Sequence, residues 1–288
     1  MLMTMKDLLV PASEQGFAIP AFNISSWQFL KGIVECCEEK KAPVIIAIHP
    51  NELSFQGDEI VDACKAFANR SHVPMAIHLD HGGNMQQILR ALRAGFTSVM
   101  IDASSKPFEE NIAITKQVVE IAHSMGVTVE AELGTIGTAD NNNEGGANQI
   151  IYTNPEDAEK FIAATGIDAL AVAIGTSHGI YPKGFEPHLR FDILQEIKKR
   201  VNIPLVLHGG SANPDEEIAQ SVKLGINKIN ISSDIKDAFY QRLRITLEDK
   251  KVREPNELYP ASIEAMKKVA CHKIDLFDAA DKMKYYKL

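Results

Sequence analysis

A carboxylate and an imidazole stand next to each other in the stretch AIHLDHGG, as Asp80 and His81. A carboxylate can accept and return a proton, and an imidazole can bind a metal ion. An isolated Asp-His pair is also typical of a polar turn at a strand end, so its interpretation depends on other residues. Two further histidines, His178 and His208, each precede a glycine. Three histidines brought to one place predict a catalytic Zn²⁺ site with a fourth position open for substrate.

Two acidic side chains offer oxygen ligands. Asp102 follows the apolar run TSVMI, and Glu132 lies near the end of VTVEAEL. We expect them to form a second or alternative metal position, or to orient the imidazoles by hydrogen bonds. His78 is expected to support the site without binding metal. The remaining histidines away from the site are expected as solvated or packing residues: His72, His123, His188 and His272.

Two small loops that carry hydroxyl groups follow the last two apolar runs of the chain. HGGS covers residues 208–211, and NISSD covers residues 230–234. Such turns can aim backbone N–H groups and a helix N-terminus at an anion. Either loop alone is typical of an ordinary turn, but together beside the histidines they predict a phosphate site.

Eight short apolar runs rich in Val, Ile and Ala predict buried parallel strands. They are FAIPAF (17–22), PVIIAI (43–48), PMAIHL (74–79), TSVMI (97–101), VTVEAEL (127–133), DALAVAI (168–174), IPLVLH (203–208) and NKINIS (227–232). Segments of helical periodicity lie between them, for example EIVDACKAFANR, MQQILRALRAG and NPEDAEKFIAATG. Eight such units in about 250 residues predict an α/β fold, the (β/α)8 TIM barrel, with additional N- and C-terminal helices.

A doubly wound open sheet is the alternative fold. It usually has five or six strands and begins with a glycine-rich phosphate loop, whereas the first turn of this chain reads AFNISS. The barrel is therefore favoured. No stretch has the composition of a linker, so we expect one TIM-barrel domain over residues 1–288.

A TIM barrel carries its active site at the carboxyl ends of its strands. Every predicted strand ends in polar residues: Asn23, His49, Asp80 with His81, Asp102, Glu132, 175–179, 208–211 and 230–233. The fold thus explains how residues far apart in the sequence can form one site.

Composition narrows the classes of function. The chain has 288 residues and a formal net charge of −8, without a Lys/Arg cluster, so we expect no nucleic acid partner. No apolar run is long enough for a membrane span, and the start lacks the features of a signal peptide, so we expect a cytoplasmic protein. Cys36, Cys37, Cys64 and Cys271 are expected to be free thiols that pack in the core.

The chain resembles the class II, zinc-dependent ketose-bisphosphate aldolases of the tagatose- and fructose-bisphosphate aldolase group. The resemblance rests on AFN, LDHG, MIDAS, VEAELG, AVAIGTSHG, PLVLHGGS, KINISSD and the helix IEAMKKV, which occur in that order over nearly all of the sequence. It implies reversible aldol cleavage of a ketose phosphate or bisphosphate to dihydroxyacetone phosphate and glyceraldehyde 3-phosphate or a related aldehyde.

The resemblance also implies a role for each site residue. Asp80 would exchange a proton with the C4 hydroxyl, and Asn230 would donate to the enediolate oxygen. The Zn²⁺ ligands would be His81, His178 and His208, and Asp102 with Glu132 would mark the second metal position. The dihydroxyacetone phosphate half would bind Gly179, Gly209, Gly210, Ser211, Asn230, Ile231, Ser232 and Ser233, and Asn23 is a further expected substrate-binding residue. A monovalent cation, Na⁺ or K⁺, commonly lies there in this family, and a homodimer or homotetramer is expected.

The sequence departs from the family in three places. Relatives have a glutamate in the loop after strand five that moves the C3 proton, whereas this chain reads GTIGTADNNNEGGAN, so the expected base is either Asp140, which aligns there, or Glu144. Strand two ends at His49, where relatives commonly have a serine that faces the aldehyde half. Asn256 stands where relatives have an arginine that reaches the distal phosphate from a neighbouring subunit.

Features of the sequence argue against three other interpretations. A non-catalytic partner subunit of a heteromeric aldolase would lack ligands that this chain has. A metal-dependent hydrolase on the same fold would usually carry His-x-His at the end of strand one, where this chain has Phe22 and Asn23. A Schiff-base mechanism needs a lysine in the site, and Lys228 is expected at the opposite face of the barrel.

Overall fold

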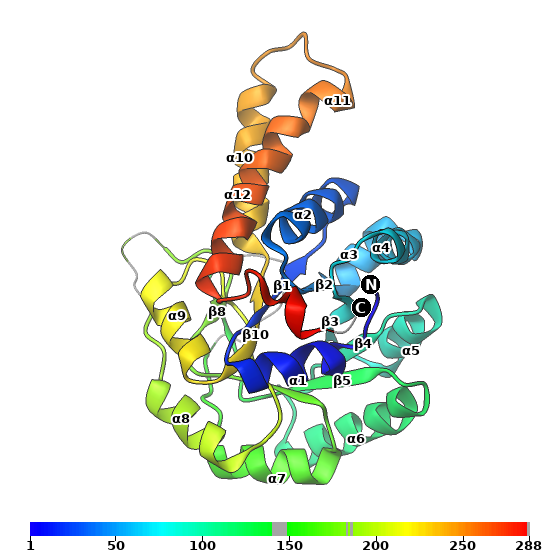
Figure 1. The fold of residues 1–288 in the computed structure, drawn as a ribbon. Coiled ribbons are helices and arrows are strands. Elements are labelled where there is room, and N and C mark those ends of the chain that lie inside the picture. The colour runs from blue at the N-terminus through cyan, green and yellow to red at the C-terminus, as the bar shows by residue number, and fades with distance from the viewer. Residues whose placement is uncertain (140–148, 183, 185–186, 287–288) are drawn as a thin grey trace.

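Eight parallel strands close into a barrel in the computed structural model, which describes residues 1–139, 149–182, 184 and 187–286 (Figure 1). The strands are β1 (Ile19–Asn23), β2 (Val44–Ile48), β3 (Met75–Gly82), β4 (Ser98–Ile101), β5 (Thr128–Leu133), β7 (Ala169–Val172), β9 (Leu205–Leu207) and β10 (Ile226–Ile231). Their order around the barrel is β1-β10-β9-β7-β5-β4-β3-β2. Each overlaps one predicted run, so the predicted TIM barrel is confirmed.

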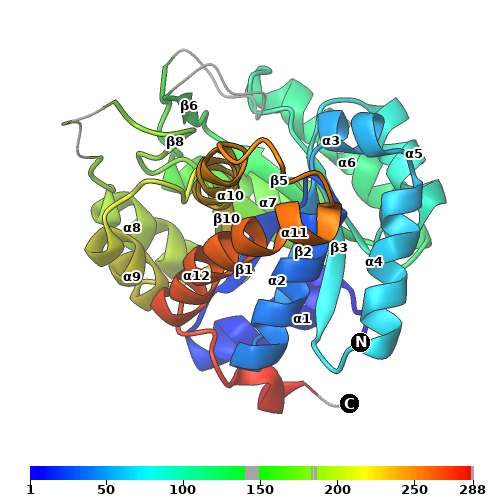
Figure 2. The ribbon, with the colours of Figure 1, turned by 90° about the horizontal axis from the view of Figure 1, so that it is seen from above.

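Helices follow the strands and surround the barrel, as the view in Figure 2 shows. They are α2 (Trp27–Lys40), α3 (Pro50–Gln56), α4 (Glu59–Arg70), α5 (Met85–Ala94), α6 (Phe108–Ser124), α7 (Pro155–Thr165), α8 (Phe191–Arg200), α9 (Asp215–Lys223) and α10 (Ser233–Thr246). Their ends carry the expected signals. Asn154 accepts hydrogen bonds from the first turn of α7, and Gly166 ends that helix in the left-handed conformation.

Additional helices lie at both ends of the chain, as predicted. Helix α1 (Met5–Gln15) covers the amino ends of the strands and buries Met5, Leu8 and Leu9. Helix α12 (Pro260–Leu276) packs along α10, and the two form an arm that projects from the barrel, with α11 (Pro255–Leu258) near its outer end (Figure 1). The 3₁₀ helix η1 (Lys282–Tyr285) follows α12.

A small second sheet, which was not predicted, lies beyond the carboxyl ends of β5 and β7. Strands β6 (Gly137–Thr138) and β8 (Ser177–His178) pair in parallel, and Ala139 N donates to the His178 carbonyl at 2.7 Å. This sheet holds the backbone of His178 at the carboxyl end of the barrel.

The structure corrects the expectation that all four cysteines are free. Cys36 on α2 and Cys271 on α12 form a disulfide, with Cα atoms 6.0 Å apart. The packing of α2 against α12 brings together two residues that are 235 positions apart, so sequence spacing gave no sign of the pair. Cys37 and Cys64 are free and buried, and burial raises the pKa of Cys64 to about 12.

None of the helices among the described residues has both the length and the apolar character that a membrane crossing requires.

Candidate active site

The Asp80-His81 pair lies on an irregularity of β3. The register with β4 shifts here, and β3 has one residue more than its partner over this interval. Such a bulge interrupts the alternation of side chains, so both residues turn to the barrel mouth. His81 takes a left-handed φ of 51°, and a Cβ on Gly82 would lie 2.6 Å from the Met100 carbonyl oxygen. Position 82 must therefore be glycine, because β3 and β4 lie too close together here for a side chain. Gly83, by contrast, has room for one.

Three histidine rings meet at the carboxyl ends of the strands. The ring centroid of His81 lies 4.9 Å from that of His178 and 4.5 Å from that of His208. The potential ligand atoms of the three side chains all lie within 4.8 Å of one another. This donor set suits Zn²⁺, which takes three imidazoles in catalytic sites.

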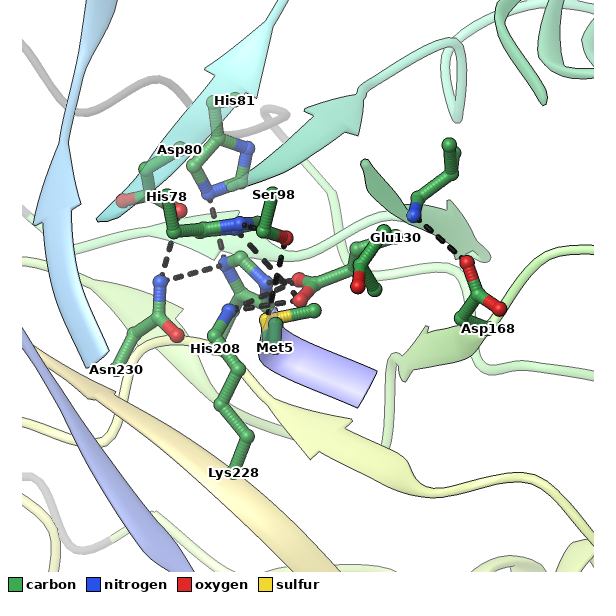
Figure 3. Close-up of polar contacts among 12 residues, drawn as sticks. Met5, His78, Asp80, His81, Ser98, Glu130, Asp168, His208, Lys228 and Asn230 are labelled. Atoms are coloured by element: carbon green, nitrogen blue, oxygen red, sulfur yellow. Dashed lines mark hydrogen bonds and ion pairs between the residues drawn. The ribbon is translucent and has the colours of Figure 1, made fainter. Parts of the chain in front are cut away.

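Carboxylates orient two of these rings. His81 Nδ1 lies 2.9 Å from Asp102 Oδ2, and His208 Nε2 lies 2.7 Å from Glu130 Oε1. The opposite nitrogens, His81 Nε2 and His208 Nδ1, are therefore turned toward each other and lie 2.8 Å apart (Figure 3). At this distance one nitrogen donates a hydrogen bond to the lone pair of the other, and a bound metal ion would take the place of that proton.

A second group of potential ligands shares His81. Its ligand atoms and those of Asp102 and Glu132 lie within 4.8 Å of one another. The three residues line a cavity of about 220 Å³ together with His178. Among the described residues, Glu132 Oε2 is buried without a hydrogen-bond partner, which suits a metal ligand.

The electrostatics of the site favour a cation. Burial lowers the pKa of His81, but the Asp80 and Asp102 carboxylates outweigh it and raise the pKa to about 10. Burial raises the pKa of Glu132 well above its usual value, and the negative charge of Asp102 adds to this effect. Both groups hold protons that a metal ion would displace. Burial lowers the pKa of His178 and of His208, so these rings are neutral, as metal ligands must be.

Two amides hold Asp80. Its Oδ1 accepts from Asn230 Nδ2 and its Oδ2 accepts from Asn23 Nδ2, each at 2.8 Å. Burial raises the pKa of Asp80, but positive charge at His81, with smaller contributions from neighbouring groups, outweighs it and places the pKa well below its ordinary value. An ionised carboxylate with both oxygens fixed is arranged to accept a proton.

A second cavity is lined by most of the predicted phosphate residues. Its lining is Asn23, Asp80, His178, Gly179, Gly209, Ser211, Asn230 and Ser232. Gly209 has a φ of 61°, and a Cβ there would lie 2.6 Å from the Ser177 carbonyl oxygen. Only glycine allows the loop after β9 to approach the backbone of Ser177 this closely.

The loop after β9 is joined to the start of α10. Ser211 Oγ accepts from the backbone N–H groups of Ser232 and Asp234, each at 3.3 Å. Ser233 is the first residue of this helix of 14 residues. The side chain of Ile231 packs in the core, so only its backbone can face a ligand. A Cβ on Gly210 would meet the Asn230 carbonyl oxygen at 2.8 Å.

His49 lies beside the histidine cluster. Its ring centroid is 6.4 Å from that of His81. It is the N-cap of α3, and its Nδ1 accepts from the Asn51 N–H at 3.2 Å. The ring therefore presents Nε2–H in either protonation state. The proposed loop bases, Asp140 and Glu144, lie outside the described residues.

The structure adds two residues that the sequence interpretation missed. Glu130 and Lys228 are fully buried inside the barrel, where Lys228 Nζ lies 2.8 and 3.0 Å from the two carboxylate oxygens (Figure 3). The expectation that Lys228 lies at the opposite face of the barrel is wrong for its side chain, which runs inside the barrel to Glu130, and Glu130 contacts His208. A lysine held in this way is not available to form an imine with substrate.

Known proteins are similar to this chain in sequence and in fold. A family model described as fructose-bisphosphate aldolase class-II matches residues 3–282. The D-tagatose-1,6-bisphosphate aldolase subunit GatY of Klebsiella oxytoca is 40% identical over 270 residues, which cover 93% of this chain and 94% of that protein.

Solved structures agree with the sequence match. The YdjI aldolase of Escherichia coli K12 has a TM-score of 0.85 and 32% identity, covering 98% of this chain and 100% of that chain. A putative fructose-1,6-bisphosphate aldolase of Coccidioides immitis has a TM-score of 0.87 and 28% identity, covering 97% of both chains. The chain therefore belongs to the class-II fructose-bisphosphate aldolase family and is an aldolase, a carbon–carbon lyase.

Proposed function

We propose that this aldolase cleaves a ketose phosphate or bisphosphate between C3 and C4 and uses Zn²⁺ held by His81, His178 and His208. The products would be dihydroxyacetone phosphate and an aldehyde. The observation that carries the proposal is the convergence of His81, His178 and His208, whose potential ligand atoms lie within 4.8 Å of one another beside the ionised Asp80. A screen of ketose phosphates for release of dihydroxyacetone phosphate tests it and identifies the sugar.

The side chains of the site have distinct roles in this reaction. Zn²⁺, when bound, polarises the substrate carbonyl and takes up the charge left by bond cleavage. Asp80 accepts the C4 hydroxyl proton and returns it in the reverse direction. Asn230, whose amide lies 2.8 Å from Asp80, is assigned to the substrate oxygen that gains negative charge. We assign the C3 proton to Asp140 or Glu144.

The phosphate of the dihydroxyacetone half is assigned to the cavity beside the histidines. Gly179, Gly209 and Ser211 line it together with Ser232, and Ser233 at the start of α10 follows directly, so the N-terminus of this helix lies beside the proposed phosphate. We propose that a Na⁺ or K⁺ ion binds the same backbone. Asp102 and Glu132 are proposed as the second metal position. Their ligand atoms and those of His81 lie within 4.8 Å of one another, which supports this assignment.

We propose a homodimer or homotetramer of one-domain subunits in the cytoplasm. The arm exposes apolar side chains of α10 and the residue after it, namely Tyr240, Ile245 and Leu247. Burial of these residues by a second copy would stabilise the assembly. The Klebsiella oxytoca relative is named as a subunit, so sedimentation of the purified chain, with catalytic activity of the same sample, distinguishes a self-sufficient oligomer from a partner subunit.

His49→Asn is expected to raise the KM for the aldehyde about tenfold in the condensation direction. Asparagine keeps an oxygen that caps α3, but it removes the Nε2–H beside His81 that we assign to the aldehyde half. Loss of one neutral hydrogen bond costs about 0.5–1.5 kcal/mol. KM is measured with each aldehyde at saturating dihydroxyacetone phosphate, and the KM for dihydroxyacetone phosphate should not change.

His49→Ala serves as the comparison, because it removes both the cap and the donor. An aldehyde KM that stays at the wild-type value in His49→Asn would restrict His49 to the capping of α3.

Asn256→Arg is expected to raise the preference for bisphosphates about 10- to 100-fold, since a charge-assisted hydrogen bond is worth about 1.5–3 kcal/mol. Asn256 is exposed on α11, near the outer end of the arm, from which we expect it to reach the site of a neighbouring subunit. The measurement compares kcat/KM for fructose- and tagatose-1,6-bisphosphate with that for the matching 1-phosphates.

In the wild-type enzyme we expect only a weak preference for a distal phosphate. Three other basic side chains could contact a distal phosphate: His188, whose Nδ1 lies 3.3 Å from Glu217 Oε1, Arg253, which is exposed, and Lys183, which lies outside the described residues. A wild-type preference for bisphosphates of several orders of magnitude, unchanged by the arginine, would refute a relaxed distal site.

A further inference from the structure

We infer that the buried Glu130–Lys228 ion pair positions His208, fixing the imidazole in the tautomer that turns Nδ1 toward the metal. The inference rests on the proposed Zn²⁺ site and extends it to two residues outside the ligand set. We assign neither Glu130 nor Lys228 a contact with substrate, and both act only through His208.

The contacts form one continuous path inside the barrel (Figure 3). Lys228 Nζ donates to Glu130 Oε1 at 3.0 Å and to Oε2 at 2.8 Å. Glu130 Oε1 also lies 2.7 Å from His208 Nε2, and His208 Nδ1 lies 2.8 Å from His81 Nε2. The path therefore begins at the ammonium group of Lys228 on β10 and ends at the histidine cluster.

The chemistry of this path fixes the tautomer. A carboxylate paired with an ammonium group can only accept a hydrogen bond, so His208 Nε2 must carry the proton and Nδ1 must present its lone pair. Because Lys228 binds both oxygens, the carboxylate cannot rotate away from the ring. A carboxylate behind an imidazole also increases its basicity as a ligand.

Stability alone does not account for the pair. Both side chains have no exposed surface, and burial of an ion pair costs desolvation energy that apolar residues of similar size would not cost. The neighbouring His78 adds no charge, because burial and Lys228 lower its pKa to about 3. His78 is buried beside Glu130, with its Nδ1 2.8 Å from Ser98 Oγ and its Nε2 3.7 Å from Glu130 Oε2.

The test compares the double variants Glu130→Leu/Lys228→Met and Glu130→Gln/Lys228→Met with the wild type. Neither leaves an unpaired buried charge, so both should fold, as thermal unfolding would show. Zn²⁺ affinity is measured by competition with a chelator. We expect Glu130→Leu/Lys228→Met to bind Zn²⁺ about 10- to 100-fold more weakly. The glutamine variant, whose amide oxygen can still accept from Nε2, should bind within a few fold of the wild type.

A second measurement does not depend on how the variants fold. In ¹⁵N-labelled, zinc-free wild-type protein, the His208 ring should show the Nε2–H tautomer. An Nδ1–H tautomer would overturn the inference, as would wild-type Zn²⁺ affinity in folded Glu130→Leu/Lys228→Met. A wild-type protein that neither binds Zn²⁺ nor cleaves ketose phosphates would instead refute the proposed function.

Discussion

Replacement of any one of His81, His178 or His208 by alanine is expected to lower bound Zn²⁺ and the rate of cleavage together. The potential ligand atoms of the three side chains lie within 4.8 Å of one another, so the loss of one leaves an incomplete set. A Lewis acid stabilises charge in a transition state by several kcal/mol, and each 1.36 kcal/mol is a factor of ten. We therefore expect a fall in kcat of roughly three orders of magnitude.

The measurement is the metal content of each purified variant beside its kcat. His272→Ala is the matched control, because this histidine is paired with Asp215 on the surface. It should keep both metal and activity. A variant of the cluster that retains full activity with less than the wild-type metal content would contradict the assignment of these ligands.

Asp80→Ala is expected to lower kcat by roughly 10²- to 10⁴-fold, as is typical for the loss of a general acid/base. Bound Zn²⁺ should stay at the wild-type level, since the Asp80 oxygens bind the amides of Asn23 and Asn230. Metal content, thermal unfolding and steady-state kinetics on the same sample check this result.

Asp80→Asn separates the shape of the side chain from its basicity. It retains the size of the carboxylate but cannot accept a proton, so a loss of kcat similar to that of Asp80→Ala is expected. Loss of Zn²⁺ in either variant would instead make Asp80 a ligand or a support of the metal site.

Much of the fold could be predicted because its signals are local. Each strand is a short run of β-branched and small apolar residues, and glycines such as Gly95 and Gly166 end helices where the periodicity stops. The barrel then places the ends of the strands together, which is why Asp80 could be assigned to the same site as His208 from sequence alone.

The sequence also indicated Glu130 and Lys228, which lie below the carboxyl ends of their strands. Side chains two apart on a strand face the same side, so Glu130 shares a face with Glu132, and Lys228 shares one with Asn230. Buried charges at such positions are unusual in a strand and indicate a second layer of polar residues under the site. His78 has the same spacing, two residues before Asp80, and is buried as well.

Other features depend on tertiary contacts and had no local signal. The bulge in β3 that turns His81 to the mouth follows from pairing with β4. Strands β6 and β8 have two residues each, too few for a periodicity. The Cys36–Cys271 pair depends on the packing of α2 against α12.

Chelation of the wild-type enzyme, followed by return of Zn²⁺, tests the account most directly. Release of dihydroxyacetone phosphate from the best ketose phosphate is followed with a coupled dehydrogenase before chelation, after it and after readdition of metal. We predict that release stops in excess chelator, returns with Zn²⁺, and leaves no substrate attached to lysine after borohydride treatment. Full release in excess chelator, or a substrate trapped on a lysine by borohydride, would contradict a zinc-dependent mechanism.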